Sequence, residues 1–239
     1  MNKNFLLIAL MMVLGLTGCT SIYRSQQVVD RYGGALDSKI ESVNKVAQTA
    51  SELASVTVDF FDEQATVIPI HHYDPDTSGN LLLVQMEDLK NLGHASDKNM
   101  DLLYFSPLQS AVAFLDRQTD YDDSFLQPGT AANSIQVVQK TKYLGVIRTT
   151  KFIDPVIQQN DWDEVVFDAG SYTGDIVFYN LESQKYIGAF NFYAENSDGL
   201  DVYEGEELKN LRNDLWSNTR KAINAKWTKY QGESSLLLD

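Results

Sequence analysis

The amino-acid sequence predicts an α+β fold, with N-terminal helices, an antiparallel β-meander in the C-terminal half and a closing amphipathic C-terminal helix. Apolar residues recur at three- and four-residue steps in the first 140 residues and again near the C-terminus, which is typical of helices. Between these regions, β-branched and aromatic runs are separated by turn residues, which is typical of strands. Helices and strands that are segregated in this way indicate α+β rather than alternating βαβ units.

The N-terminal half contains most of the expected helices. The first has Asp37 or Ser38 as its cap, and the last turns Ile135 and Val138 inward. Residues 65–72 are expected to be extended, because Pro69 fits an edge strand better than a sheet interior. The expected helices are Asp37 to about Phe61, Leu81–Leu92, a segment that starts at Ser106-Pro107, and Thr130 to about Lys140.

The C-terminal half contains the expected strands and the clearest helix. Residues 180–184 read as the turn of a hairpin between two of the strands. The last helix, from about Glu204 to Tyr230, begins with acidic residues and ends with lysines, which matches both poles of the helix dipole. The expected strands are Tyr143–Ile153, Glu164–Phe167, Tyr172–Tyr179 and Lys185–Tyr193.

Length and charge restrict the classes of protein to which this chain can belong. Its 239 residues are enough for one domain with a sizeable core, which we place at residues 37–239 with a possible sub-boundary near residue 130. The formal net charge of −14 disfavours binding to nucleic acid or to anionic lipid headgroups. Cys19 is the only cysteine in the sequence, so we expect neither a disulfide nor a cysteine nucleophile in the domain.

The first 18 residues have the organisation of a signal peptide. Lys3 supplies a positive charge, and the apolar run from Phe5 to Leu16 is shorter than the roughly 20 residues that span a membrane. Small residues then precede Cys19. We therefore expect cleavage after residue 18.

The four residues Leu16-Thr17-Gly18-Cys19 resemble the lipobox of bacterial lipoproteins. The resemblance covers the leader and not the remaining chain. It implies lipidation of Cys19, acylation of the new amino group, for example with palmitate, and attachment of residues 19–36 to a membrane as a lipidated tether. Because Thr20 rather than Asp follows the cysteine, the resemblance favours the outer membrane, facing the periplasm.

Two groups of residues are candidate metal ligands. Adjacent residues on a strand point to opposite faces, so His71 and His72 would not readily share zinc, although Asp74 and Asp76 could add oxygen ligands. We expect His71, His72 and His94 to be solvated loop histidines. Asp74, Asp76, Ser78 and Asn80 resemble the first half of a calcium loop, but Gln85 stands where a bidentate carboxylate is needed. We therefore expect no cofactor, with calcium as the alternative. A further acidic cluster reads as a solvated loop: Asp116, Asp120, Asp122 and Asp123.

No sequence pattern selects a catalytic group. Ser171 lies between Gly170 and Gly174, but it is not central, as the serine of a nucleophile elbow would be. The last third of the chain is rich in aromatic residues, most of which we assign to a core between sheet and helix, while a surplus aromatic face could bind a glycan or a protein.

We therefore expect a non-enzymatic binding or accessory lipoprotein of the envelope. Its expected contacts are the membrane, through the N-terminal lipid, and an envelope protein or glycan. The alternatives are a glycan or peptidoglycan hydrolase that uses a carboxylate pair, and a calcium-stabilised module.

Overall fold

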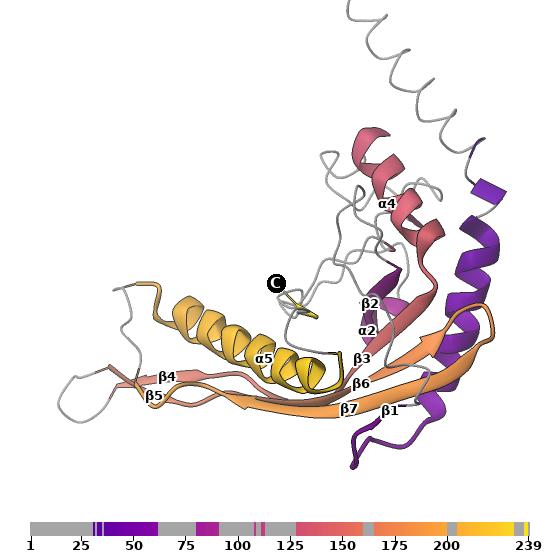
Figure 1. Cartoon of the computed structure of the whole chain (residues 1–239). Coiled ribbons are helices and arrows are strands. Elements are labelled where there is room, and N and C mark those ends of the chain that lie inside the picture. The colour runs from indigo at the N-terminus through magenta and orange to yellow at the C-terminus, as the bar shows by residue number, and fades with distance from the viewer. Residues whose placement is uncertain are drawn as a thin grey trace, which may run out of the picture.

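The computed structural model confirms the α+β fold (Figure 1). It describes residues 31, 33–34, 36–61, 80–90, 108, 111–112, 128–159, 165–199, 205–231 and 237–238. Within this part of the chain, a five-stranded sheet has helices against both faces, and a long helix closes the sequence.

The main sheet has the strand order β1-β7-β6-β3-β2. Its neighbours are antiparallel except β2 and β3, which run parallel. The strands of this sheet are β1 (Phe60–Phe61), β2 (Leu81–Gln85), β3 (Tyr143–Ile153), β6 (Ser171–Asn180) and β7 (Lys185–Glu195). A separate two-stranded antiparallel sheet consists of β4 (Val156–Gln159) and β5 (Val165–Asp168).

The helices of the described part include residues 36–52, α2 (Met86–Lys90), α4 (Pro128–Lys140) and α5 (Glu207–Gln231), and residues 31, 33–34, 108 and 111–112 are also helical. The expected inward positions of α4 are confirmed, because Ile135 and Val138 are fully buried. Leu36, which the sequence analysis placed in the tether, is helical and fully buried. The core of the domain therefore begins at least as early as this residue.

Two element assignments from the sequence were wrong. The first helix ends at residue 52 and not near Phe61, which lies in β1. The segment Leu81–Leu92 begins as strand β2 and becomes helical only at Met86. A short continuous apolar run fits a buried strand as well as a helix, and here pairing with β3 decides the conformation.

One face of the sheet packs on helix 36–52 and α4 through aliphatic side chains. Alternate residues of the strands face this side, for example Leu144 and Val146 of β3 and Val177 of β6. Val43, Val46 and Ala50 of the helix pack in the same core. We call this side the aliphatic face.

The opposite face packs on α5 through aromatic side chains, and we call it the aromatic face. Phe178 packs against Trp227 with ring centroids 5.3 Å apart, and Tyr172 meets Trp216 edge to face at 5.6 Å. Phe61 of β1 joins this core, with its ring centroid 4.6 Å from that of Tyr230. Most of the buried aromatic residues of the last third thus form the sheet–helix core that the sequence predicted.

The end of the chain also packs on the aromatic face. Asn224 of α5 accepts hydrogen bonds from the backbone N–H groups of Leu237 and Leu238, and it donates one to the Leu238 carbonyl oxygen at 2.6 Å. Both leucines are buried in the aromatic core. One side chain thereby satisfies three polar backbone groups that burial would otherwise leave unpaired.

Candidate functional site

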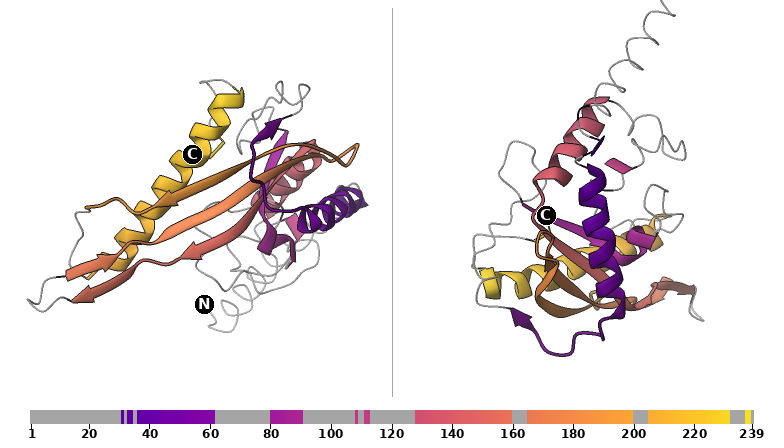
Figure 2. Two further views of the ribbon diagram at one scale, coloured as in Figure 1. Left: turned by 90° about the horizontal axis from the view of Figure 1, so that it is seen from below. Right: turned by 90° about the vertical axis from the view of Figure 1, so that its right-hand side faces the viewer.

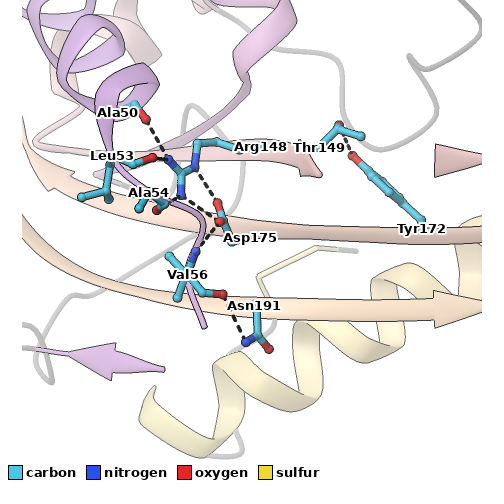
Figure 3. Close-up of polar contacts among 9 residues, drawn as sticks. All are labelled: Ala50, Leu53, Ala54, Val56, Arg148, Thr149, Tyr172, Asp175 and Asn191. Carbon is cyan, nitrogen blue, oxygen red and sulfur yellow. Dashed lines mark hydrogen bonds and ion pairs between the residues drawn. The ribbon is translucent and has the colours of Figure 1, made fainter. Parts of the chain in front are cut away.

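The most buried ion pair of the described residues lies where helix 36–52 ends over the sheet (Figure 3). Arg148 of β3 and Asp175 of β6 are cross-strand neighbours on the aliphatic face. Arg148 donates from Nε to Asp175 Oδ1 at 2.6 Å and from Nη2 to Oδ2 at 2.7 Å, which is a bidentate pair. The Asp175 side chain is 2% exposed and that of Arg148 is 12% exposed.

Arg148 also caps helix 36–52. Its guanidinium group donates to the carbonyl oxygens of Ala50, Leu53 and Ala54 at 2.6–3.0 Å (Figure 3). The last carbonyl groups of a helix have no partner within the helix, and a cation there is favoured by the helix dipole. The Arg148–Asp175 pair therefore fixes where the helix ends.

Residues 53–61 connect this helix to β1, and we call them the strap. The strap follows the edge of β7. Val56 N–H donates to Asp175 Oδ2 at 2.9 Å, and the Asn191 amide donates to the carbonyl oxygens of Val56 and Thr57. Asp59 then receives a bond from Lys226 Nζ at 2.7 Å. The strap is thus attached to both faces of the sheet.

Burial raises the pKa of Asp59, but the hydrogen bonds from Lys226 and from the Asn191 N–H outweigh this effect and leave the pKa below its usual value. Asp214 of α5 behaves in the same way. Burial raises its pKa, and bonds from the Ser197 N–H, the Asn196 amide and the Ser197 hydroxyl lower it further than burial raises it. Both carboxylates are therefore held in the charged form.

These three carboxylates, Asp175, Asp59 and Asp214, are poorly suited to proton transfer. Both oxygens of each accept hydrogen bonds from side-chain or backbone donors. A general base needs a free oxygen within reach of its substrate and a pKa near the working pH. The geometry assigns all three carboxylates to holding the fold together.

Burial raises the pKa of Tyr172 to about 12, although a hydrogen bond with Thr149 partly opposes this shift (Figure 3). A phenol with so high a pKa stays neutral at physiological pH. It lies within the aromatic core, where it contacts Phe152, Phe192 and Trp216. Tyr172 is therefore a core residue with a satisfied hydroxyl group.

Most of the candidate ligands from the sequence lie outside the described residues. Asn80 is the exception, and its carbonyl oxygen accepts backbone hydrogen bonds from Lys142 and Tyr143 at the start of β3. Among the described residues, no three His, Cys, Asp or Glu side chains gather as a metal site. The candidates outside the described part are His71, His72, His94, Asp74, Asp76, Ser78, Asp116, Asp120, Asp122, Asp123 and Cys19.

Ser171 lies at the start of β6, where it is paired with Glu195 of β7. The segment that surrounds it is regular antiparallel sheet and not a strand-to-helix turn. The geometry of a nucleophile elbow is therefore absent at this serine.

Three exposed apolar groups among the described residues were not found from the sequence, and the third of them, Val156 and Val166, lies on the small β4–β5 sheet. The first is the strap surface, formed by Leu53, Val58, Phe60 and Tyr186. Val58 is 76% exposed and Phe60 is 51% exposed, and the Phe60 ring stacks on Tyr186 with centroids 6.1 Å apart. The sequence analysis missed this surface because it assigned residues 53–61 to the first helix. Polar and apolar residues alternate strictly from Val56 to Phe60, and this pattern could have indicated an extended segment instead of a helix.

The second group lies on the aliphatic face, beyond the end of helix 36–52. Tyr193 is 55% exposed and Ile153 is 41% exposed. In Figure 2, left, this part of the sheet projects beyond the helix, toward the β4–β5 hairpin.

No helix in the part of the chain that the structure describes combines the length and the apolar character needed to cross a bilayer. Comparisons with protein-family models, with curated proteins and with solved structures gave no match to this chain.

Proposed function

We propose that this chain is a lipoprotein of the bacterial envelope, anchored through Cys19, whose domain binds another envelope protein without catalysing a reaction. The strap surface carries this proposal. It presents two large apolar side chains, Val58 and Phe60, to solvent at the edge of the sheet. Exposed apolar side chains that lie together mark sites of protein contact more often than singly scattered ones do, and the Phe60 ring here stacks on Tyr186.

The strap surface is rigid, which favours binding. Val56 and Asp59 are fixed by hydrogen bonds on either side of Val58, and Phe60 is paired with Ala189 of β7. A surface that is already ordered loses little conformational entropy when a partner binds. β1 also ends the strand order of the sheet, so among the described strands nothing pairs with its outer edge.

The charged groups of the described domain support a binding role over a hydrolytic one. Its most buried carboxylate, Asp175, is neutralised by Arg148, and Asp59 and Asp214 are occupied by donors. A hydrolase with a carboxylate pair needs one acid with a raised pKa beside one that stays ionised. Asp59 and Asp214 both have lowered pKa values instead.

Replacement of Cys19 by Ser tests the anchor. The expected result is that the protein moves from the membrane fraction to the soluble periplasmic fraction, because the leader is still exported and no lipid is added. Fractionation with an antibody against the domain measures this. Continued sedimentation of the variant with membranes would show that the lipid on Cys19 is not what holds the protein.

Binding is tested with the full-length protein, cross-linked in intact cells and then purified. We expect a defined partner that is lost in the double variant Val58→Ser, Phe60→Ser. The matched control is Ile153→Ser, which removes an exposed apolar side chain elsewhere and should leave the partner bound. Peptidoglycan cleavage that one Asp or Glu substitution abolishes would overturn the proposal in favour of a hydrolase.

A further inference from the structure

The uncovered end of the aliphatic face has a regular arrangement of six side chains, which we call the distal face. The strand register places Tyr193 opposite Thr173 and Thr173 opposite Lys151 in one row. The next row, farther from helix 36–52, contains Glu195, Ser171 and Ile153. The strap and the end of helix 36–52 cover the row on the other side, which contains Asn191, Asp175 and Arg148.

The two rows begin directly beyond this covered row. A bulge at Thr150 shifts the β3 register between Thr149 and Lys151, and so turns Lys151 to the same side as Thr173. Phe152 faces the other way and contacts Tyr172 in the aromatic core. Lys151 and Ile153 are therefore neighbours on the distal face, and both are exposed.

The side chains of the distal face differ in size between its centre and its sides. The central strand β6 contributes only the short hydroxyl side chains of Ser171 and Thr173. The flanking strands contribute the longer Tyr193, Glu195 and Lys151.

Two diagonals cross this arrangement. One joins the apolar side chains of Tyr193 and Ile153, and the other joins the opposite charges of Glu195 and Lys151. With ordinary strand and residue spacings, the ends of each diagonal are about 12 Å apart. This pattern of charges and apolar groups is self-complementary.

We propose that the distal face binds the distal face of a second copy of this chain about a two-fold axis. The axis lies between the two faces, along the diagonal from Tyr193 to Ile153. Rotation about it places Lys151 opposite Glu195 of the partner subunit, and the reverse contact follows by symmetry. The apolar groups near the axis meet their own counterparts.

The internal bond of Glu195 is compatible with this arrangement. Tyr193 donates from its hydroxyl group to Glu195 Oε2 at 2.6 Å, which holds the carboxylate on the outer surface and leaves Oε1 for a cation. The symmetry-related Lys151 supplies that cation. Tyr193 thus orients the acid and also contributes apolar area at the axis.

The negative net charge of the chain opposes dimer formation, and the two ion pairs between Lys151 and Glu195 of the two copies offset part of that repulsion. Copies with a net charge of −14 repel one another, so apolar contact alone would be opposed. The distal face is also small, as expected for a weak and reversible interface. Attachment to a shared membrane, which rests on the proposed anchor, would raise the local concentration of the copies.

This interface is distinct from the strap surface. Val58 and Phe60 lie on the strap, whereas the distal face consists of strand residues beyond its covered row. A dimer would therefore leave the strap surface available for the envelope partner. Loss of one contact should leave the other intact, so the two proposals fail separately.

Cysteine cross-linking of the full-length protein in its own membranes tests the dimer. Ile153→Cys lies near the axis, and under mild oxidation it should give a disulfide-linked dimer. Val58→Cys is the matched control, because it is more exposed but lies on the strap. We expect at least about tenfold more dimer from the Ile153→Cys protein.

Charge reversal in the Ile153→Cys protein tests the orientation. Lys151→Glu alone and Glu195→Lys alone should each reduce the disulfide-linked dimer about tenfold, since each converts two attractive contacts into repulsive ones. The double variant Lys151→Glu, Glu195→Lys restores both contacts and should recover most of the dimer. A circular dichroism melt confirms that each variant is folded.

Equal cross-linking at residues 58 and 153, or no recovery in the double variant, would overturn the proposal. A disulfide between the cysteine introduced by Ile153→Cys and a different protein would also overturn it and would identify a foreign occupant of the distal face. Dimer formation by the Cys19→Ser version of the Ile153→Cys chain, at higher concentration in solution, would support it without the anchor.

Discussion

The two faces of the main sheet are covered in different ways. The aromatic face packs on the single 25-residue helix α5, with rings from both layers in contact. The aliphatic face packs on helix 36–52 and α4, and its cover stops at the Arg148–Asp175 pair. Beyond that pair, the same strands present exposed Tyr193 and Ile153.

This difference shows how the same strands can form a core on one face and a binding surface at the end of the other. Side chains alternate along a strand, so each strand carries two independent patterns. On the aromatic side the pattern is apolar as far as Phe192 and Phe152 except at Thr149, whose hydroxyl group is bonded to that of Tyr172. On the aliphatic side the strands carry apolar residues under helix 36–52, then the charged pair Arg148–Asp175, and then the polar and apolar residues of the distal face. The charged pair therefore marks the boundary between the core and the exposed surface.

The largest expected effect comes from Asp175→Asn. This change leaves the Arg148 charge buried without its carboxylate, and loss of one partner from a buried pair costs about 3–5 kcal/mol of unfolding free energy. Urea unfolding monitored by tryptophan fluorescence measures the loss.

Asp154→Asn is the matched control for Asp175→Asn, because Asp154 pairs with Arg212 at a site where the two side chains are 40% and 28% exposed. A surface pair contributes at most about 1 kcal/mol. Equal losses in the two variants would mean that Arg148–Asp175 is no more important than a surface pair.

A smaller effect is expected from Phe61→Ala, which tests how the strap is fastened to the aromatic face. The Phe61 ring contacts Phe178, Phe190, Trp227 and Tyr230. Truncation should cost about 3 kcal/mol through lost contacts and a cavity.

Phe60→Ala, one residue away, removes a ring that is 51% exposed and should cost less than about 1 kcal/mol. Thermal melts of the two variants compare them directly. A larger loss for Phe60→Ala would contradict the assignment of this ring to a binding surface.

A smaller effect than that of Phe61→Ala is expected at Asp59, where Lys226 of α5 holds the strap. Its folded-state pKa is lowered, so its contribution to stability is present above the unfolded pKa of about 3.9 and is lost as the pH falls below it. We expect Asp59→Asn to cost about 1 kcal/mol at pH 7.

The difference between wild type and Asp59→Asn should be constant above about pH 5 and should shrink as the pH falls below about 3.9 and through the lower pKa of the folded state. Urea unfolding at a series of pH values measures it. A difference that does not depend on pH would mean that the carboxylate charge plays no part in holding the strap.

Sequence periodicity predicted those elements whose conformation is decided locally. Strand Tyr143–Ile153 was placed correctly, and α5 was found with its start three residues too early. The first helix was extended too far because the apolar spacing continues through Ala54 to Phe61. What ends it is Arg148, which is 94 residues from Ala54. A contact so distant leaves no signal near the helix.

The candidate surfaces were less predictable than the fold. Asp175 stands between Gly174 and Ile176 in the buried stretch of β6, and a charge at such a position indicates a buried partner without identifying it. The distal face depends on the register of β6 with β3 and β7, whose paired residues on this face are 18–24 residues apart in sequence, and on the bulge at Thr150. Register of this kind is set by tertiary packing.

The capping of helix 36–52 by Arg148 also has a mechanical consequence. A pull on the chain from its N-terminal side enters the domain through this helix, where Arg148 of the central sheet bonds to the carbonyl oxygen of Ala50 in the last turn and to those of Leu53 and Ala54 directly after it. Tension would pass from the helix to β3 and β6 before it reached the strap. The exposed strap surface would therefore keep its shape under a load that had already begun to strain the helix.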